Sequence, residues 1–139
     1  MTVHIIYWSG TGNTEAMAGL IEQGAAEAGA TVVCKGLAQA SPADIEGCDV
    51  LVLGCPSMGD EVLEEGDFEP FFASIEGALS GKRVALFGSY GWGDGQWMRD
   101  WAERAKAAGA DLVDDGLIVN EAPTGGESDR CVAYGKALA

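Results

Sequence analysis

Basic residues are scarce in this sequence. Its 139 residues include eight lysines and arginines against 22 aspartates and glutamates, which gives a formal net charge of −14. Nucleic acids and anionic membrane surfaces would repel such a chain, whereas partners with a basic face would attract it. Acidity that serves only solubility or a salty habitat is the alternative. Against it, ten acidic residues and no basic one lie between Lys35 and Lys82, and six of the ten fall between Asp60 and Glu69.

Metal-ligand side chains are equally few. The sequence has one histidine, His4, within an apolar run, and its four cysteines form no C-x-x-C pair. No zinc site is therefore predicted, and His4 is expected to be a strand residue. Cys34, Cys48 and Cys55 stand in or beside apolar stretches, so we expect them to be buried free thiols.

Long apolar runs are also missing. None approaches the roughly 20 residues that a membrane span needs. The start, MTVHIIYW, has no basic segment of the kind that opens a signal peptide. A cytoplasmic protein without membrane contact is the default expectation. The length and the lack of any linker predict one domain over residues 1–139.

The sequence does contain a regular alternation of strand and helix patterns. Apolar runs predict strands at residues 3–8, 31–34, 49–53, 83–87 and within 111–119. Apolar residues at helical spacing predict helices at 13–28, 68–79, 95–108 and 126–138, and Ser41-Pro42 is typical of a further helix start. The apolar inner strands indicate a parallel sheet that is covered by helices on both faces. Ligands of such sheets bind beyond the carboxyl ends of the strands.

Three loops at those ends are rich in glycine and small polar residues. They follow the first, third and fourth predicted strands and read SGTGNT from Ser9, CPSMGDE from Cys55 and GSYGWGD from Gly88. In the first loop, glycines let backbone N–H groups approach an anion, and the next helix adds the positive end of its dipole. Ser9, Thr11, Asn13 and Thr14 offer further donors. The loop therefore predicts a phosphate site without a cation, with a simple turn and helix cap as the alternative.

Standard nucleotide motifs do not fit this loop. No lysine follows the glycines, which disfavours a nucleotide-hydrolysing P-loop, and Glu15 stands where G-x-G-x-x-G needs a small residue.

Met58 and Trp92, at the tips of the other two loops, could hold a flat ring between them. Trp92 as an exposed interaction residue is the alternative. Trp97 and Trp101, spaced i, i+4 on a predicted helix, are expected in the core, whereas Trp8 is expected partly in the core or over a phosphate.

Several segments resemble short-chain flavodoxins of the clostridial type. The resemblance rests on SGTGNTE, GCPSMGDEVLEE, FEPFF, VALFGSYGWGDG and WMRDW, and it extends from Val3 to about Glu121. It implies a three-layer flavodoxin-like fold with a five-stranded parallel sheet of order 2-1-3-4-5. It also implies one non-covalent FMN and low-potential one-electron transfer, mainly between semiquinone and hydroquinone, without substrate turnover.

The same resemblance implies roles for individual residues. Ser9, Gly10, Thr11, Gly12, Asn13 and Thr14 would hold the FMN phosphate. Met58 and Trp92 would cover the inner and outer faces of the flavin ring. The Gly59–Asp60 peptide would face N5, and Glu61 would accept a hydrogen bond from N3–H. Ser89, Tyr90 and Gly91 would reach the pyrimidine edge and ribityl chain. Pro56 replaces a serine of some relatives, which removes one hydroxyl contact, and Ser57 completes the second loop.

The charges of the second loop agree with a low potential. Asp60, Glu61 and the acidic residues that follow add negative charge near a phosphate that no cation neutralises, so adding an electron to the ring is costly. Partners are expected to be redox proteins with basic docking faces, such as reductases and ferredoxin-dependent acceptors, and the protein is expected to be a monomer.

Two rival interpretations use the same topology. A flavin enzyme such as an NAD(P)H-linked quinone or nitro reductase needs a second pocket over the ring, which Trp92 would block. A receiver domain needs acidic residues after the first strand and an aspartate after the third, where this chain has Tyr7-Trp8 and Gly54-Cys55.

Overall fold

A computed structural model describes all residues from Met1 to Ala139. Strands and helices alternate along the chain, in the order β1 (Thr2–Tyr7), α1 (Asn13–Glu27), β2 (Thr31–Gly36), β3 (Val50–Gly54), α2 (Phe68–Glu76), β4 (Arg83–Tyr90), α3 (Gln96–Ala107), β5 (Asp111–Leu112), β6 (Leu117–Asn120) and α4 (Gly126–Leu138). The strands form one parallel sheet of order β2-β1-β3-β4-β5, and β6 also pairs with β4. The predicted three-layer fold and strand order are confirmed.

The fifth predicted strand is interrupted. Its two parts, β5 and β6, both pair with β4 but at opposite ends of that strand. Between them the chain bends at Gly116, which has a φ of 104° and whose N–H donates to Asp114 Oδ1 at 2.9 Å. Few residues other than glycine adopt such a φ, so the bend breaks the ladder here. The sheet consequently has six strand segments rather than five strands.

The helix start expected at Ser41 is only a short 3-10 turn. This turn, η2, covers Pro42–Ile45, and an earlier one, η1, covers Leu37–Gln39. The backbone N–H of Ser41 donates to Asp44 Oδ2 at 2.7 Å. The start signal is thus used, but no apolar stripe follows it that could bury a longer helix.

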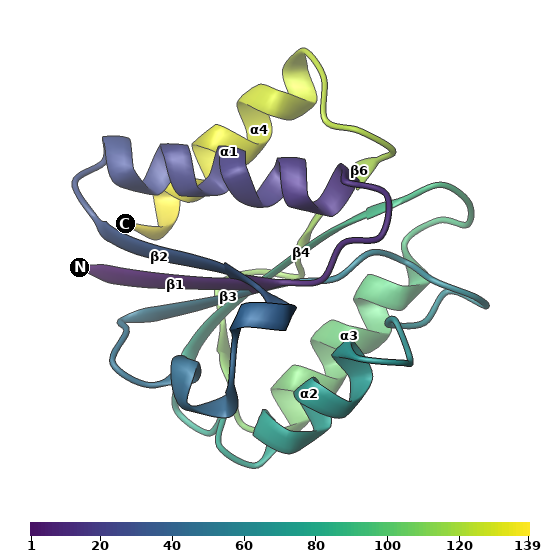
Figure 1. The fold of residues 1–139 in the computed structure, drawn as a ribbon, viewed down its shortest axis with the longest axis horizontal. Coiled ribbons are helices and arrows are strands. Elements are labelled where there is room, and N and C mark those ends of the chain that lie inside the picture. Colours follow the sequence, from purple (N-terminus) through teal and green to yellow (C-terminus); the bar gives the residue numbers. More distant parts are fainter.

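Helices cover both faces of the sheet. Figure 1 shows α1 and α4 on one face and α2 and α3 on the other. Each face has its own core cluster, because successive side chains of a strand point to opposite faces. In β3, for example, Leu51 and Leu53 join the cluster under α2 and α3, whereas Val50 and Val52 join the one under α1 and α4. None of the helices combines the length and the hydropathy that a bilayer crossing requires.

Aromatic residues concentrate on the α2 and α3 side. Trp97 and Trp101 are each 1% exposed, which confirms their predicted place in the core. The rings of Phe68 and Trp101 meet edge to face, with centroids 5.4 Å apart. Arg104 joins α3 to α2 through bonds of its guanidinium to the carboxylates of Glu69 and Glu76.

On the other face, α1 and α4 touch through glycines. A Cβ on Gly24 would overlap the carbonyl oxygen of Val132, and a Cβ on Gly135 would overlap that of Ile21. The two backbones can pack this closely only because both positions lack a side chain.

The cysteines are free, but not all of them are buried. Cys55 and Cys131 are buried, as expected for the first, whereas Cys34 and Cys48 are half-buried. Burial raises the pKa of Cys55 to about 12, so its thiol stays protonated. His4 Nδ1 lies 2.8 Å from the carbonyl oxygen of Asp44, and no cluster of side chains is arranged to hold a metal ion.

Candidate functional site

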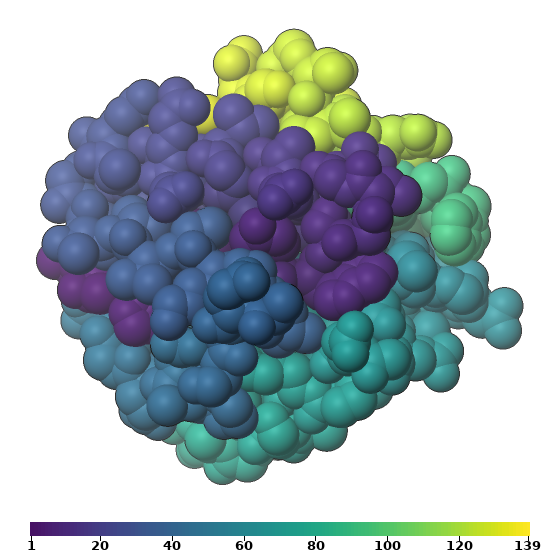
Figure 2. Space-filling view, in the orientation of Figure 1, coloured from purple at the N-terminus to yellow at the C-terminus, as the bar shows by residue number.

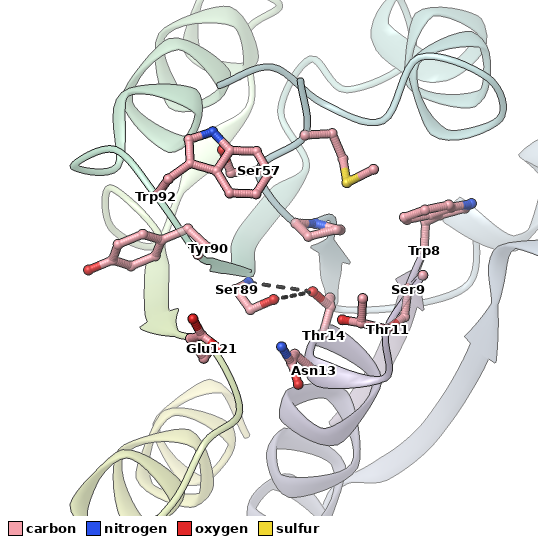
Figure 3. A pocket seen from close by; sticks show the side chains of 14 residues that line it. Trp8, Ser9, Thr11, Asn13, Thr14, Ser57, Ser89, Tyr90, Trp92 and Glu121 are labelled. Carbon is pink, nitrogen blue, oxygen red and sulfur yellow. Dashed lines mark hydrogen bonds between the residues drawn. The ribbon is translucent and has the colours of Figure 1, made fainter. Parts of the chain in front are cut away.

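A cavity of about 420 Å³ lies beyond the carboxyl ends of β1, β3 and β4. Figure 3 shows its lining side chains, with Trp8 and Trp92 on opposite sides and Thr14 and Ser89 between them. We call it the loop cavity. Its lining consists of Trp8, Ser9, Gly10, Thr11, Asn13, Thr14, Pro56, Ser57, Met58, Ser89, Tyr90, Gly91, Trp92 and Glu121. All three predicted loops thus contribute to one site.

Most of the residues that the sequence singled out line this cavity. The four that do not are Gly12, Gly59, Asp60 and Glu61. Glu121 was missed, because only the loops after the first, third and fourth strands were considered. It follows β6 directly, has a φ of 60°, and its N–H donates to the carbonyl oxygen of Tyr90 at 2.8 Å. A glutamate shortly after the strand predicted within 111–119 was the available signal.

The first loop leaves several backbone donors free. Helix α1 starts after Gly12, which has a φ of 95° and no side chain of its own to cap the helix. Ser9 Oγ accepts from the N–H groups of Gly12 and Glu15, both at 3.2 Å. The N–H groups of Gly10, Thr11, Asn13 and Thr14 have no partner within the chain. Free N–H groups at a helix N-terminus form a binding place for an anion.

A buried hydroxyl pair joins the first loop to the third. Thr14 and Ser89 are 1% and 4% exposed, and their hydroxyl oxygens lie 3.1 Å apart. The N–H of Ser89 also donates to Thr14 Oγ1, at 3.4 Å. Thr14 therefore positions the loop against β4.

The second loop is a small hairpin. Met58 and Val62 exchange two backbone hydrogen bonds of 2.8 Å, which leaves Gly59, Asp60 and Glu61 as the tip. Gly59 has a φ of 53° and Glu61 a φ of 56°. The tip thus has a backbone conformation in which Gly59 is the least strained residue.

Glu61 ties this hairpin to the third loop. Its Oε1 accepts from the N–H of Asp94 at 3.2 Å and from the N–H of Gln96, the first residue of α3, at 3.3 Å. A Cβ on Gly93 would overlap this carboxylate. In this structure the Glu61 side chain therefore caps α3 instead of lining the cavity.

Ser57 carries an unsatisfied polar group. It is 3% exposed, it lines the loop cavity, and its Oγ has no hydrogen-bond partner. Its N–H, in contrast, donates to the carbonyl oxygen of Ser89 at 3.0 Å. A buried hydroxyl without a partner costs free energy, so its place in a cavity indicates a ligand with a polar atom there.

The floor behind the loops is closely packed. Trp97 Nε1 donates to the carbonyl oxygen of Cys55 at 3.1 Å, and a Cβ on Gly88 would overlap that same carbonyl. Trp92, in contrast, is 53% exposed at the rim. The site therefore combines a closely packed base with one large exposed aromatic side chain at its rim. No lysine or arginine lines it, and Glu121 is its one charged side chain.

These features fit FMN in three respects. The free N–H groups of the first loop suit a phosphate, and the cavity volume lies in the range of about 300–1,000 Å³ that is usual for ligand sites. Met58 and Trp92 provide apolar surface on the two other loops that line the cavity.

Comparisons with known proteins agree with this arrangement. A sequence model described as flavodoxin matches residues 5–135. The flavodoxin of Clostridium beijerinckii is 51% identical over 135 residues and 97% of each chain, and that of Megasphaera elsdenii is 47% identical over 137 residues, 99% of this chain and 98% of the other. The solution structure of two-electron reduced Megasphaera elsdenii flavodoxin superposes with a TM-score of 0.87 at 46% identity, over 99% of both chains.

Proposed function

The chain belongs to the flavodoxin family, and on that premise we propose that the loop cavity is its FMN site. The protein is a small electron-transfer protein that carries FMN, and it is a carrier rather than an enzyme. FMN, when bound, supplies one-electron chemistry at its ring. We propose that residues 1–139 form one FMN-binding domain. The observation that carries the site proposal is that free backbone donors, an unpaired hydroxyl and two large side chains converge on one cavity.

The phosphate is proposed to bind at the first loop, from Ser9 to Thr14. The free N–H groups of Gly10, Thr11, Asn13 and Thr14 and the dipole of α1 support this. Gly12 starts the helix with its positive φ, and Ser9 Oγ holds the turn by accepting hydrogen bonds from two backbone N–H groups. Hydrogen bonds and the helix dipole thus replace the cation that many phosphate sites use.

The ring is proposed to lie between Met58 and Trp92, with the Gly59–Asp60 peptide at its N5 edge. Pro56, Ser89, Tyr90 and Gly91 complete the surroundings of the ring and ribityl chain. Glu61 is proposed to accept from N3–H. Its carboxylate faces the third loop, beside Gly93, and this position next to the loop of Trp92 supports that role.

Ser57 is proposed as a further polar contact of FMN. Its hydroxyl is buried in the cavity without a partner, whereas that of Ser89 is already paired with Thr14. A contact from the Ser57 hydroxyl would partly replace the hydroxyl contact to FMN that is lost because Pro56 stands where some relatives have serine.

A low potential is the further expectation. No cation lines the cavity, and Asp60, Glu61 and Glu121 lie at or beside it. Negative charge and burial both oppose the addition of an electron to the ring, and about 1.4 kcal/mol of such opposition lowers a one-electron potential by about 59 mV.

Redox proteins are the partners of such a carrier. We propose that these partners present basic faces, as reductases and ferredoxin-dependent acceptors would, and that the protein itself is a monomer. The acidic run from Asp60 to Glu69 and the net charge of −14 support this.

Mass spectrometry of the cofactor released from purified protein tests the proposal. We expect FMN at one per chain, a yellow protein, and no oxidation of NAD(P)H. FAD in place of FMN would contradict the single phosphate site, and steady oxidation of NAD(P)H would favour the reductase interpretation.

A further inference from the structure

A second, apolar hollow lies beside the loop cavity and shares Trp8 with it. We call it the Trp8 pocket. It has a volume of about 380 Å³ and is lined by Trp8, Leu37, Ala38, Asp67 and Phe71. These residues come from the end of β1, from η1 and from the start of α2. In the space-filling view the purple, blue and teal segments that carry them meet on one face of the molecule (Figure 2).

The pocket is a surface feature rather than a core defect. Trp8, Leu37 and Phe71 are half-buried and pack against the core cluster under α2 and α3, while Ala38 and Asp67 are exposed. One side of each aromatic group is thus fixed by the core, and the other side faces the hollow. Apolar surface held in this way is available to an incoming side chain without rearrangement.

The charges around the pocket are of one sign. No lysine or arginine lines the Trp8 pocket, the loop cavity or the groove between Tyr7 and Gln39 that adjoins both. Asp67 and Glu15 are the charged residues of the pocket and the groove. Lys35, the basic residue nearest in sequence, is held by Asp44 at 2.9 Å. An occupant must therefore combine an apolar centre with positive charge around it.

From these observations we propose that the Trp8 pocket binds a large apolar side chain, flanked by lysine or arginine, of the proteins that exchange electrons with this chain. The proposal rests on the proposed function. A second copy of the chain does not suit the pocket, because two surfaces of this acidity repel each other. Anionic lipid is disfavoured for the same reason.

The position of Trp8 gives the pocket its significance. Trp8 lines both hollows, so a partner seated in the Trp8 pocket touches the wall of the proposed FMN site. Acidic residues would attract the partner over a distance, and the apolar anchor would fix its orientation after contact. Central apolar anchors with a charged rim are the usual arrangement of protein interfaces.

Peptide titration of the FMN-loaded protein tests the proposal. The probes are Lys-Lys-Phe-Lys-Lys and Lys-Lys-Ala-Lys-Lys, which carry equal charge, and binding is followed by amide chemical shifts at two salt concentrations. We expect the Phe peptide to bind about fivefold more tightly, and the ratio to persist at high salt. Shifts specific to the Phe peptide should centre on Leu37, Ala38 and Phe71.

Variants and a kinetic assay complete the test. Leu37→Asn should abolish the preference for the Phe peptide, whereas Val33→Asn, on the exposed face of β2, should keep it. The Phe peptide should also slow electron transfer to cytochrome c, a basic acceptor, more than the Ala peptide does. Equal affinity for the two peptides, shifts centred elsewhere, equal loss in both variants or equal inhibition would overturn the proposal. FMN content and redox titration of the same samples report on the proposed function separately.

Discussion

Thr14 Oγ1 and Ser89 Oγ lie 3.1 Å apart in the interior, 75 positions apart in the sequence. The pair fastens the first turn of α1 to the end of β4, and neither group reaches water. The geometry of the first loop thus depends on a contact with a distant strand.

Removing the contact between Thr14 and Ser89 should lower the unfolding free energy of the protein even when no FMN is bound. Thr14→Val keeps the shape and leaves the Ser89 hydroxyl and N–H without their partner. We expect a loss of about 1–2 kcal/mol of unfolding free energy in the apoprotein, measured by urea denaturation. Thr11→Val, at an exposed loop position without a hydrogen bond, is the matched control and should be near neutral. Equal stability of the two variants would mean that the buried pair contributes nothing.

The crossing of α1 and α4 should be intolerant of a single methyl group. Gly135→Ala would force the new Cβ onto the carbonyl of Ile21, and the helices would have to separate. We expect a loss of about 1–3 kcal/mol. Gly19→Ala, on α1 with open space around it, should instead stabilise by up to about 1 kcal/mol. Thermal unfolding of both variants makes the comparison, and a stable Gly135→Ala protein would contradict the close packing.

The start of α2 should be sensitive to pH. The Glu64 carboxylate accepts from the N–H groups of Gly66, Asp67 and Phe68 at 2.7–2.8 Å. Burial alone would raise the pKa of Glu64, but these three bonds outweigh it and lower the pKa. The bonds therefore stabilise the fold above the unfolded pKa of about 4.3, and their contribution is lost as the pH falls through the lower, folded pKa.

Glu64→Gln isolates this contribution. At pH 7 we expect the variant to be less stable than the parent by about 1 kcal/mol. The difference should shrink as the pH falls below the unfolded pKa, because the carboxyl group of the unfolded parent is protonated first, and little of it should remain below the lower, folded pKa. Urea denaturation at several pH values gives the difference directly, and a gap that widens in acid would refute the assignment.

Gly59 should influence the redox potentials. Gly59 lies at the hairpin tip. Its carbonyl oxygen is proposed to accept a hydrogen bond from flavin N5–H, a donor that would be present only once the ring has taken up its first electron. Gly59→Thr places a stiff, β-branched residue at a φ of 53°. FMN should stay bound, and the first one-electron potential should become more negative, so that the two potentials separate less. Unchanged potentials in a redox titration would place the switch elsewhere.

Glu61→Gln should weaken FMN binding without abolishing it. A neutral acceptor replaces the carboxylate, at a cost of about 1–2 kcal/mol. Because Glu61 also caps α3, the apoprotein should become slightly less stable as well. Fluorescence quenching of added FMN measures the affinity, and an unchanged value in all redox states would restrict Glu61 to its contact with α3.

The sequence predicts the sheet and the three loops well, because their signals are local. Apolar strands, Gly-rich ends and helix spacing specify β1, β3, β4 and the residues that follow them. The break at Gly116 was not predicted, because an apolar run on either side of Asp114-Asp115 looks like one strand. The sequence also could not predict that the Glu61 carboxylate accepts hydrogen bonds at the start of α3, or that the Ser57 hydroxyl has no partner. Both depend on how two distant loops meet.

The two core clusters differ in a way that matters for spectroscopy. Trp97 and Trp101 lie in the cluster under α2 and α3, Trp8 packs against it, and Trp92 stands at the rim of the cavity. The cluster under α1 and α4 contains no tryptophan. Tryptophan fluorescence would therefore mainly record unfolding of the half under α2 and α3, and it would respond little if α4 alone opened. Agreement between fluorescence and far-ultraviolet circular dichroism during denaturation would show that the two halves unfold together.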